Sequence, residues 1–382
     1  MYMWRELDLG EVRDELQQIA DIGFDTVRLL ALTEDFMPRR GIVDRTVLGR
    51  LVDVTRAAAD AGLTVVPTLI VLNMSGRIWW PSWMLDASGR PADLYADPSI
   101  VRAQAQLVGA CAAALAGDRS VRAFDIANEI DGAVRPASRD AARTWTSVMA
   151  ASIRRGAPGI PVRIGAHLPS LTTENHLRVD DLASVLDEEV MHAYPLYCDT
   201  ARSFLDPELV PYACALTAAL SKTGRPALIQ EFGLCTAPNG QAGHSFTDDF
   251  LGTPRTQYLA SEDEAAAYYD AVLNRLVATG AAGAYAWCYA DYHPSLFTRP
   301  PLVTAIRERT FGLVRADGRE KPAANVFRKL RQRRDSDALR IEHTSPLHHA
   351  ASVRLDVSAD EYYRSPGAHF GRLYDRWLGG RS

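Results

Sequence analysis

Two glutamates stand at the ends of two apolar segments of the chain. Glu129 closes the run that begins at Phe124, and Glu231 lies near the end of the run Ala227–Gly233. Both runs are short and rich in residues that form buried strands. If both strands belong to one parallel barrel, their carboxyl ends meet at the same rim. Two carboxylates gathered there could supply an acid/base and a nucleophile for the cleavage of a glycosidic bond.

The segments that would position these glutamates alternate between helices, with helical periodicity, and short apolar strands. Helical periodicity is predicted over seven stretches: Leu9–Ile22, Arg45–Ala61, Val101–Ala116, Ser138–Arg154, Asp206–Lys222, Ser261–Thr279 and Pro322–Arg331. Short apolar runs lie between them: Thr26–Leu30, Thr64–Val71, Val121–Ala127, Val162–Ala166, Val190–Ala193, Ala227–Ile229 and Ala282–Trp287. This alternation predicts a parallel sheet of βα units, and an α/β (β/α)₈ TIM barrel fits it better than an open doubly wound sheet.

The barrel predicted in this way lacks its first strand. The first apolar run follows a helix, and only Met1–Trp4 precedes that helix. An absent strand would leave two edges of a parallel barrel unpaired. We therefore expect that the natural chain starts upstream of Met1, or that another segment closes the gap, with Val353–Val357 as a weak candidate. Residues 1–333 are predicted to form the barrel, and residues 334–382 an extension with one helix near His369–Leu378.

Composition excludes several classes of protein. The formal net charge is −5, so the chain has no excess of positive charge that would favour binding to nucleic acid or to an anionic membrane surface. No apolar run reaches the roughly 18–20 residues of a membrane span. The five cysteines are dispersed, which indicates reduced thiols rather than a disulfide framework or a zinc site. The first ten residues have no apolar signal-peptide core, so a cytoplasmic protein is expected unless an upstream leader is missing.

Polar and aromatic residues follow most of the predicted strands, where a barrel enzyme carries its active site. Each of them taken singly is more often structural. The ordered set consists of Arg28, Asn73, Asn128, Glu129, His192, Tyr194, Glu231 and Trp287.

Apart from Asn73, the set resembles the glycoside hydrolases of the two-glutamate (β/α)₈ clan, and family 5, the cellulase and mannanase group, most of all. The resemblance implies that Glu129 is the acid/base and Glu231 the nucleophile of a retaining β-glycosidase that degrades oligo- or polysaccharides. It also implies that Asn128 binds the sugar 2-hydroxyl, that Tyr194 holds Glu231 and that Arg28 keeps Glu231 ionised. Trp287 would form the floor of the sugar-binding subsite at the scissile bond, and His192 would also bind substrate. No cofactor or metal is implied.

Two features extend or modify this resemblance. The family usually has a histidine after the third strand, whereas this chain has Asn73, which can still bond a sugar hydroxyl. The loop that follows contains Trp79, Trp80 and Trp83. Sugar rings stack on flat aromatic side chains, so at least one of these tryptophans is expected to contact ligand, and Trp79 and Trp80 are the candidates.

Two other functions remain open from the sequence. A carbohydrate-binding barrel without turnover would keep the glutamates, and its expected partner would still be a carbohydrate. A metal-dependent sugar isomerase would need three or four carboxylate or histidine ligands at strand ends, which is more than the chain offers. Turnover of aryl β-glycosides distinguishes the first alternative, and metal analysis distinguishes the second.

Overall fold

The computed structural model describes residues 3–250, 252–336 and 353–380. These residues divide into two compact units. The first unit comprises Met1–Met74, Ile78–Ala166 and Asn175–Glu188, and the second comprises Ser75–Arg77, His167–Glu174 and Glu189–Ser382. Each unit is described by itself.

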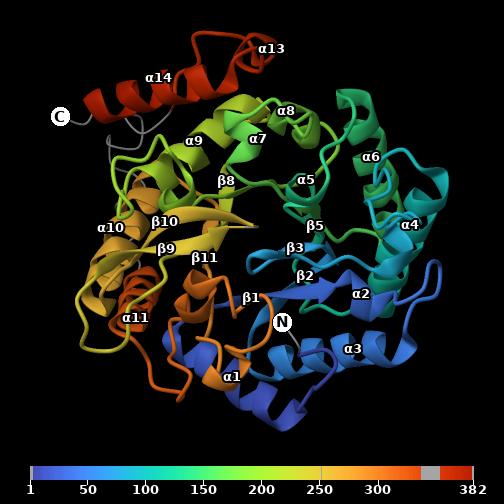
Figure 1. The fold of residues 1–382 in the computed structure, drawn as a ribbon, viewed down its shortest axis with the longest axis horizontal. Helices are drawn as coiled ribbons and strands as arrows, with labels where there is room; N and C mark the ends of the chain where they lie inside the picture. The colour runs from blue at the N-terminus through green and yellow to red at the C-terminus, as the bar shows by residue number, and fades with distance from the viewer. Residues whose placement is uncertain (1–2, 251, 337–352, 381–382) are drawn as a thin grey trace. The chain divides into compact units, whose positions relative to one another are not determined.

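A four-stranded parallel sheet forms the centre of the first unit (Figure 1). Its strands, in spatial order, are β1 (Thr26–Leu32), β2 (Thr64–Val71), β5 (Phe124–Asn128) and β6 (Val162–Gly165). All five residues of β5 are buried, and so are seven of the eight residues of β2. Burial on both faces explains why these strands read as continuous apolar runs.

Helices and short turns surround this sheet within the first unit. They are α1 (Leu9–Ile22), α2 (Thr33–Phe36), α3 (Arg45–Asp60), η1 (Ser82–Met84), α4 (Pro98–Ala114), α5 (Ile130–Ala133), α6 (Arg139–Gly156) and α8 (Val179–Ala183), with the two-residue strand β3 at Asn73–Met74. The long helices begin where a side chain caps their first amides: Asp8, Asp44, Asp97 and Ser138. Gly23, with φ of 107°, ends α1 and turns the chain into β1.

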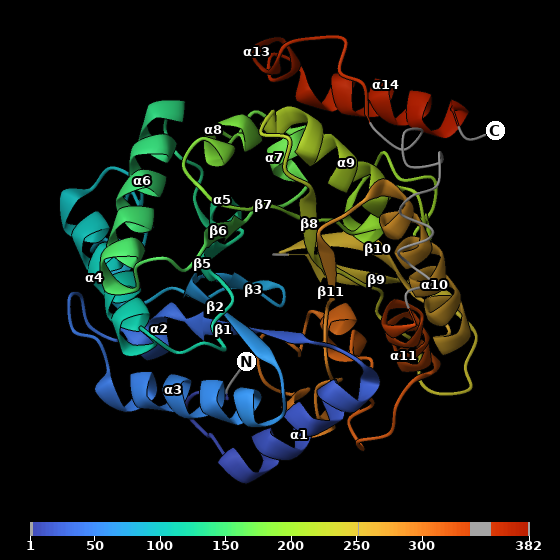
Figure 2. The ribbon, with the colours of Figure 1, turned by 180° about the vertical axis from the view of Figure 1, so that it is seen from behind.

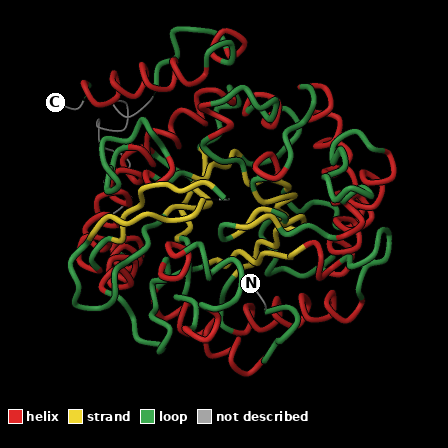
Figure 3. The backbone as a smooth tube through the Cα atoms, in the orientation of Figure 1, coloured by secondary structure: helices red, strands yellow, loops and turns green. Residues whose placement is uncertain are grey.

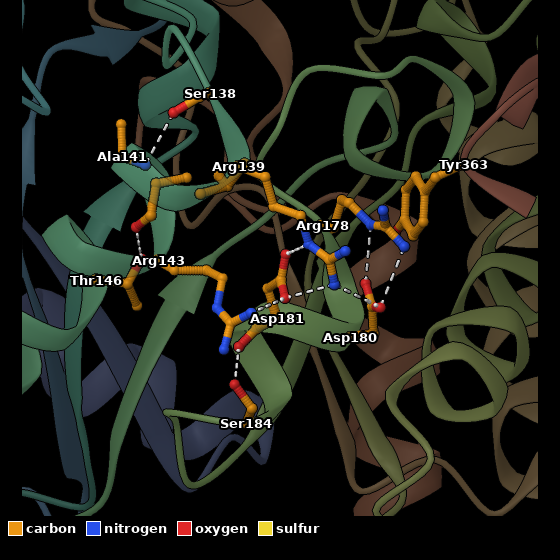
Figure 4. A network of polar contacts seen from close by, with 12 residues as sticks. Ser138, Arg139, Ala141, Arg143, Thr146, Arg178, Asp180, Asp181, Ser184 and Tyr363 are labelled. Carbon is orange, nitrogen blue, oxygen red and sulfur yellow. Dashed lines mark hydrogen bonds and ion pairs between the residues drawn. The ribbon is translucent and has the colours of Figure 1, made fainter. Parts of the chain in front are cut away.

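Helices α6 and α8 are joined by a cluster of charges (Figure 4). Arg139 of α6 donates to Asp181 at 2.9 Å, and Arg143 of α6 lies 3.5 Å from the same carboxylate. Arg178 donates to Asp180 at 3.2 Å. The side chains of Arg139 and Arg143 are more than a third exposed, so each pair contributes modestly, within about 0–1 kcal/mol.

The segment before α1 forms turns rather than a strand over residues 3–8. Trp4 is nevertheless buried, and its indole N–H donates to the carbonyl oxygen of Leu30 in β1 at 2.7 Å. The ring packs edge-on against Phe36 at 5.2 Å between centroids, and Arg50 of α3 donates to the Trp4 carbonyl oxygen. A side chain thus satisfies a backbone group of β1.

The second unit contains a three-stranded parallel sheet and an antiparallel ribbon. The sheet has the order β11 (Gly283–Ala286), β8 (Ala227–Phe232) and β7 (Glu189–His192). The ribbon pairs β9 (His244–Phe250) with β10 (Thr253–Leu259), which Figures 2 and 3 show as two long neighbouring strands. Most residues of the ribbon are exposed or half-buried. The short strand β4 is Arg77–Ile78.

The helices of the second unit are α7 (Pro169–Thr172), η2 (Pro195–Tyr197), α9 (Leu209–Ser221), α10 (Glu262–Thr279), η3 (Pro294–Leu296), η4 (Ile306–Thr310), α11 (Pro322–Asp335), α13 (Ala359–Tyr362) and α14 (Pro366–Gly379). A capping box begins α10, because Ser261 accepts from the Glu264 amide and the Glu264 carboxylate accepts from the Ser261 amide.

The described C-terminal residues pack on α7 and α9 of the second unit (Figure 1). Tyr212 of α9 donates to the carbonyl oxygen of Phe370 at 2.7 Å, and Tyr374 of α14 donates to Asp206 at 2.7 Å. Helix α11 runs through residue 333. A boundary at 333 between a barrel and an extension remains a prediction, and residues 337–352 of that extension lie outside the described residues.

All seven predicted strands and all seven predicted long helices are present in the structure; the bounds of α1 and β2 are those predicted, and the others differ by a few residues. The suggestion of a late strand at Val353–Val357 is wrong, since those residues have no strand partner among the described residues. The hairpin β9–β10 was not predicted, because its alternation of mainly polar residues carries no apolar run. No helix in the described part of the chain is long and apolar enough to cross a membrane.

Candidate functional site

Glu129 stands where β5 ends and α5 begins. Its backbone lies in the left-handed region, with φ of 43° and ψ of 46°, which is uncommon for a residue other than glycine. Its amide donates to Gly165 O at 2.9 Å, and its carbonyl oxygen accepts from the Gly132 amide at 2.9 Å. Such a conformation costs of order 1–3 kcal/mol and persists only where the surrounding structure enforces it, which occurs most often at functional sites.

A buried ion pair lies beneath Glu129 in the first unit. Arg28 of β1 donates from Nη2 to Asp125 Oδ2 at 2.9 Å, and the two side chains are 5% and 0% exposed. The same Nη2 donates to Asn128 Oδ1 at 2.7 Å. Thr68 of β2 donates to Asp125 Oδ2 at 2.6 Å. The sequence predicted Arg28 and Asn128 but missed Asp125, which the arginine needs as a counter-charge in this buried position.

Asn73 completes this first half-site, defined as Arg28, Asn73, Asp125, Asn128 and Glu129. Its side-chain amide donates to Glu129 Oε2 at 3.1 Å, and its carbonyl oxygen accepts from Asn128 Nδ2 at 2.7 Å. Asn73 therefore holds Asn128, the last residue of β5, through its backbone carbonyl, and Glu129, the residue after β5, through its side chain. The expected contact of Asn73 with a sugar hydroxyl remains a prediction.

In the second unit, Glu231 lies in β8 and is buried, with 6% of its surface exposed. Tyr194 donates from Oη to Glu231 Oε2 at 2.9 Å. His192 Nδ1 lies 3.4 Å from Glu231 Oε1. The parallel register explains this meeting, because β7 and β8 are neighbours and His192 pairs with Glu231. The resemblance implied that Tyr194 holds Glu231, and the structure has that hydrogen bond.

Trp287 follows β11 in the same unit. Its amide donates to Phe232 O at 2.9 Å, and its side chain is half-buried. Gly233 lets the chain after β8 pass close to it, since a Cβ at Gly233 would lie 2.3 Å from the Trp287 carbonyl oxygen. The peptide bond Trp287–Cys288 is cis.

Glu308 is a further carboxyl group of the second unit, and the sequence reasoning missed it. It lies on the short helix η4 and is 7% exposed. Burial raises its pKa to about 7; the negative charge of Glu231 adds to this shift, while Arg307 opposes it. The neighbouring Arg307 is only 1% exposed, although an arginine in a charged stretch usually lies on a solvated surface. It pairs with Asp248 of β9 at 2.7 Å.

The three tryptophans after β2 differ in their surroundings. Trp79 is 3% exposed, and its indole N–H donates to Met74 O at 3.1 Å, so it packs its own loop. Trp83 donates to Met37 O at 2.7 Å. Trp80 is half-buried and keeps accessible surface. Of the two tryptophans predicted to contact ligand, Trp79 is almost fully buried and Trp80 is not, and the contact itself remains a prediction.

The cysteines are free thiols in the structure. Burial raises the pKa of Cys111 and of Cys214 to about 12. Such thiols are protonated at neutral pH and unreactive, which fits a structural role.

Comparison with known proteins places the fold among glycoside hydrolases. No protein-family model and no curated protein sequence matches the chain. Among solved structures, a GH5_18 protein from Streptomyces cattleya, in complex with Manβ1-4GlcNAc, has a TM-score of 0.79 at 23% identity, covering 100% of this chain and 89% of the other. A GH5_18 protein from Bifidobacterium longum subsp. longum has a TM-score of 0.74 at 18% identity, covering 88% and 75%.

A third similar structure is the exo-β-1,4-mannosidase Op5Man5 from the Opitutaceae bacterium strain TAV5. It has a TM-score of 0.73 at 25% identity, covering 89% of this chain and 58% of the other. The predicted (β/α)₈ fold is therefore confirmed, and so, at the level of the fold, is the resemblance to family 5 glycoside hydrolases.

Proposed function

We propose that this protein is a retaining β-glycoside hydrolase in which Glu231 is the nucleophile and Glu129 the acid/base. The observation that carries the proposal is the pair of half-sites, each built on a strand end around one glutamate. Glu231 accepts a hydrogen bond from Tyr194, and Glu129 is held by Asn73 and by its left-handed backbone. In a (β/α)₈ barrel, the carboxyl ends of the strands form one rim, where active sites lie.

Double displacement accounts for the different environments of the two carboxyl groups. In the first step, Glu231 attacks the anomeric carbon while Glu129 gives its proton to the departing glycosidic oxygen. In the second step, Glu129 takes a proton from water, which attacks the same carbon and releases Glu231. A hydrogen-bond donor such as Tyr194 Oη suits a carboxylate that must be ionised to attack.

The proposed substrate is a β-mannoside. Support comes from the structures with the same fold, one of which holds Manβ1-4GlcNAc and another of which is an exo-β-1,4-mannosidase. Trp80 and Trp287 are both half-buried, and each has an aromatic face on which a sugar ring could stack. We therefore propose Manβ1-4GlcNAc and aryl β-mannosides as first substrates, with β-glucosides and β-galactosides for comparison.

The test uses three variants and two leaving groups. Glu231→Gln is expected to lose nearly all turnover on every substrate. Glu129→Ala is expected to lose most activity on Manβ1-4GlcNAc but to keep rapid glycosylation by dinitrophenyl β-mannoside, because that leaving group departs without a proton. Glu11→Gln, on the exposed first turn of α1, is the matched control.

Three results would overturn the proposal. Full activity of Glu231→Gln would show that Glu231 is not the nucleophile. If Glu129→Ala loses the same factor in glycosylation rate with both leaving groups, Glu129 is not the acid. A protein that binds Manβ1-4GlcNAc without any turnover would instead be a carbohydrate-binding barrel.

A metal-dependent enzyme, such as a sugar isomerase, is tested by removing and adding divalent metal ions. Glu129, His192 and Glu231 are residue types that also bind metal ions. The proposal requires that activity persists after treatment with a chelator and is not raised by added divalent ions. Loss of activity on chelation, restored by a metal, would favour the isomerase or another metal enzyme.

A further inference from the structure

Glu308 is held beside the Glu231 half-site by two tyrosines. Tyr194, which donates to Glu231, has its ring 5.4 Å from the ring of Tyr197. Tyr197 in turn donates from Oη to Glu308 Oε1 at 3.4 Å. The two carboxyl groups are thus linked through a pair of packed aromatic rings, all within the second unit.

The arginine next to Glu308 does not explain why a carboxyl group is buried there. Arg307 has its Nη1 occupied by Asp248 Oδ2 and by Asp249 O, each at 2.7 Å. The Asp248 carboxylate also accepts from the amides of Ile306 and Arg307. By contrast, Arg307 Nε lies 3.4 Å from Glu308 Oε1. Asp248 is therefore the counter-charge of Arg307, and Glu308 makes only long contacts in this network.

The backbone around Glu308 is arranged to bring other segments close to it. A Cβ at Gly76 would lie 2.9 Å from Ala305 Cβ and 3.6 Å from Glu308 Cγ, and Gly76 has a φ of 74°. A glycine is needed there for both reasons. The ribbon strand β9 supplies Asp248, its one buried residue, to fix the start of η4. Two segments far apart in the sequence thus define where the Glu308 side chain lies.

Burying the Glu308 carboxyl group with only long contacts costs stability. Because Glu308 lies near Glu231, the proposed nucleophile, we looked to the reaction for a role that offsets this cost. A sugar ring bound for attack by Glu231 presents several hydroxyl groups to the side chains around that glutamate. Hydroxyl groups donate hydrogen bonds, and a carboxylate can accept two of them. The contacts of Glu308 Oε1 with Tyr197 Oη and Arg307 Nε are both 3.4 Å, which is longer than the usual distance between a hydroxyl donor and a carboxylate, so a sugar hydroxyl group that reached Glu308 would form the shorter hydrogen bond.

The geometry points to Glu308 as a specificity-determining residue of the half-site around Glu231, where it accepts hydrogen bonds from hydroxyl groups of the sugar that Glu231 attacks. This inference rests on the proposed glycosidase function. It adds a third carboxyl group to the site, one that takes no part in bond breaking and instead selects sugars by the position of their hydroxyl groups.

The test is a double-mutant cycle that combines substitution of the Glu308 side chain with removal of single hydroxyl groups from the sugar. Wild type, Glu308→Ala and Glu308→Gln are assayed on p-nitrophenyl β-mannoside and on analogues that each lack one hydroxyl group. The assay is run at pH 8, above the raised pKa of Glu308 of about 7, so that its carboxyl group is ionised. Glu308→Ala is expected to lower kcat/KM about 10- to 100-fold on the parent sugar, as for a hydrogen bond to a charged group. For the hydroxyl group that Glu308 binds, its removal should slow the wild type by a similar factor and slow the variant little.

The inference fails if every missing hydroxyl group costs wild type and Glu308→Ala the same factor. Its failure differs from failure of the proposed function, in which wild type turns over no glycoside or Glu231→Gln remains active. Glu308→Gln keeps the shape of the side chain, so coupling that weakens in both variants while neither thermal midpoint falls below that of wild type identifies contact with sugar rather than loss of folding. Glu11→Gln is the control and should match wild type on all analogues.

Discussion

The buried position of Glu308 predicts a stability that depends on pH, and Glu308→Gln should remove that dependence. Burial raises the pKa of Glu308 from 4.5 to about 7, with Arg307, Asp248, Tyr197 and Glu231 as its charged and titratable neighbours. Below pH 4.5 the carboxyl group is protonated in both the folded and the unfolded protein. Between pH 4.5 and about 7 only the unfolded chain loses the proton, so the free energy of unfolding falls as the pH rises.

The size of this effect follows from the two pKa values. Their difference corresponds to about 3 kcal/mol, fully lost once the pH has risen above the folded-state pKa. A chain of 382 residues has an unfolding entropy of roughly 0.8 kcal/mol per degree, so the change amounts to about 4 °C in thermal midpoint. A glutamine at this position cannot ionise and carries no such penalty.

The assay compares thermal midpoints of wild type, Glu308→Gln and the exposed control Glu11→Gln at pH 5 and pH 8. Part of the penalty is already present at pH 5, because that value lies above the unfolded-state pKa of 4.5. The midpoint of Glu308→Gln relative to wild type should therefore be about 3 °C higher at pH 8 than it is at pH 5. Glu11→Gln should follow wild type at both values. If the difference between Glu308→Gln and wild type is the same at pH 5 and pH 8, the carboxyl group is not held protonated by burial, and the reasoning is refuted.

Three further predictions follow from the contacts described. Tyr194→Phe removes the donor to Glu231 Oε2, so kcat/KM should fall about 10- to 100-fold with an unchanged far-ultraviolet circular dichroism spectrum; an unchanged rate would show that this hydrogen bond does not serve the nucleophile. Asp125→Asn breaks the buried pair with Arg28 and should cost about 3–5 kcal/mol in urea unfolding, whereas Arg139→Ala in the half-exposed cluster of Figure 4 should cost about 1 kcal/mol or less; equal losses would contradict the difference in burial. Cys111 and Cys214 should react with a thiol reagent only after unfolding, which peptide mapping of labelled native protein can check; rapid labelling of either in the native state would contradict their burial.

Strands β2, β5 and β8 could be predicted because they are buried on both faces and their sequences are therefore rich in apolar residues. The bounds of β2 and α1 were predicted to the residue, since Thr64–Val71 is continuous and Gly23 ends the helix. The start of β5 was placed three residues early, because Val121 is apolar but only bridges to Val65 ahead of the strand. Apolar character alone does not distinguish a strand from the segment that leads into it.

The parts that were missed depend on contacts between distant segments. Asp248 reads as one acidic residue in a polar stretch, and its burial arises only when it meets Arg307 from η4. Glu308 likewise follows an arginine in a segment without apolar periodicity, so nothing local marks it as buried. Asp125 lies inside a run that was recognised, but its pairing with Arg28 depends on the register of β1, β2 and β5. Long-range pairing of charges is not encoded in any local pattern.

The most direct test of the central claim is to trap the glycosyl-enzyme and locate the bond. A 2-deoxy-2-fluoro-β-mannosyl fluoride should form a covalent adduct at Glu231, because the fluorine slows both steps and the good leaving group restores the first. Mass spectrometry of peptides should place one sugar on Glu231, and the Glu231→Gln variant should take up none. A label on Glu308 or Glu129, or turnover with inversion and no adduct, would contradict the account.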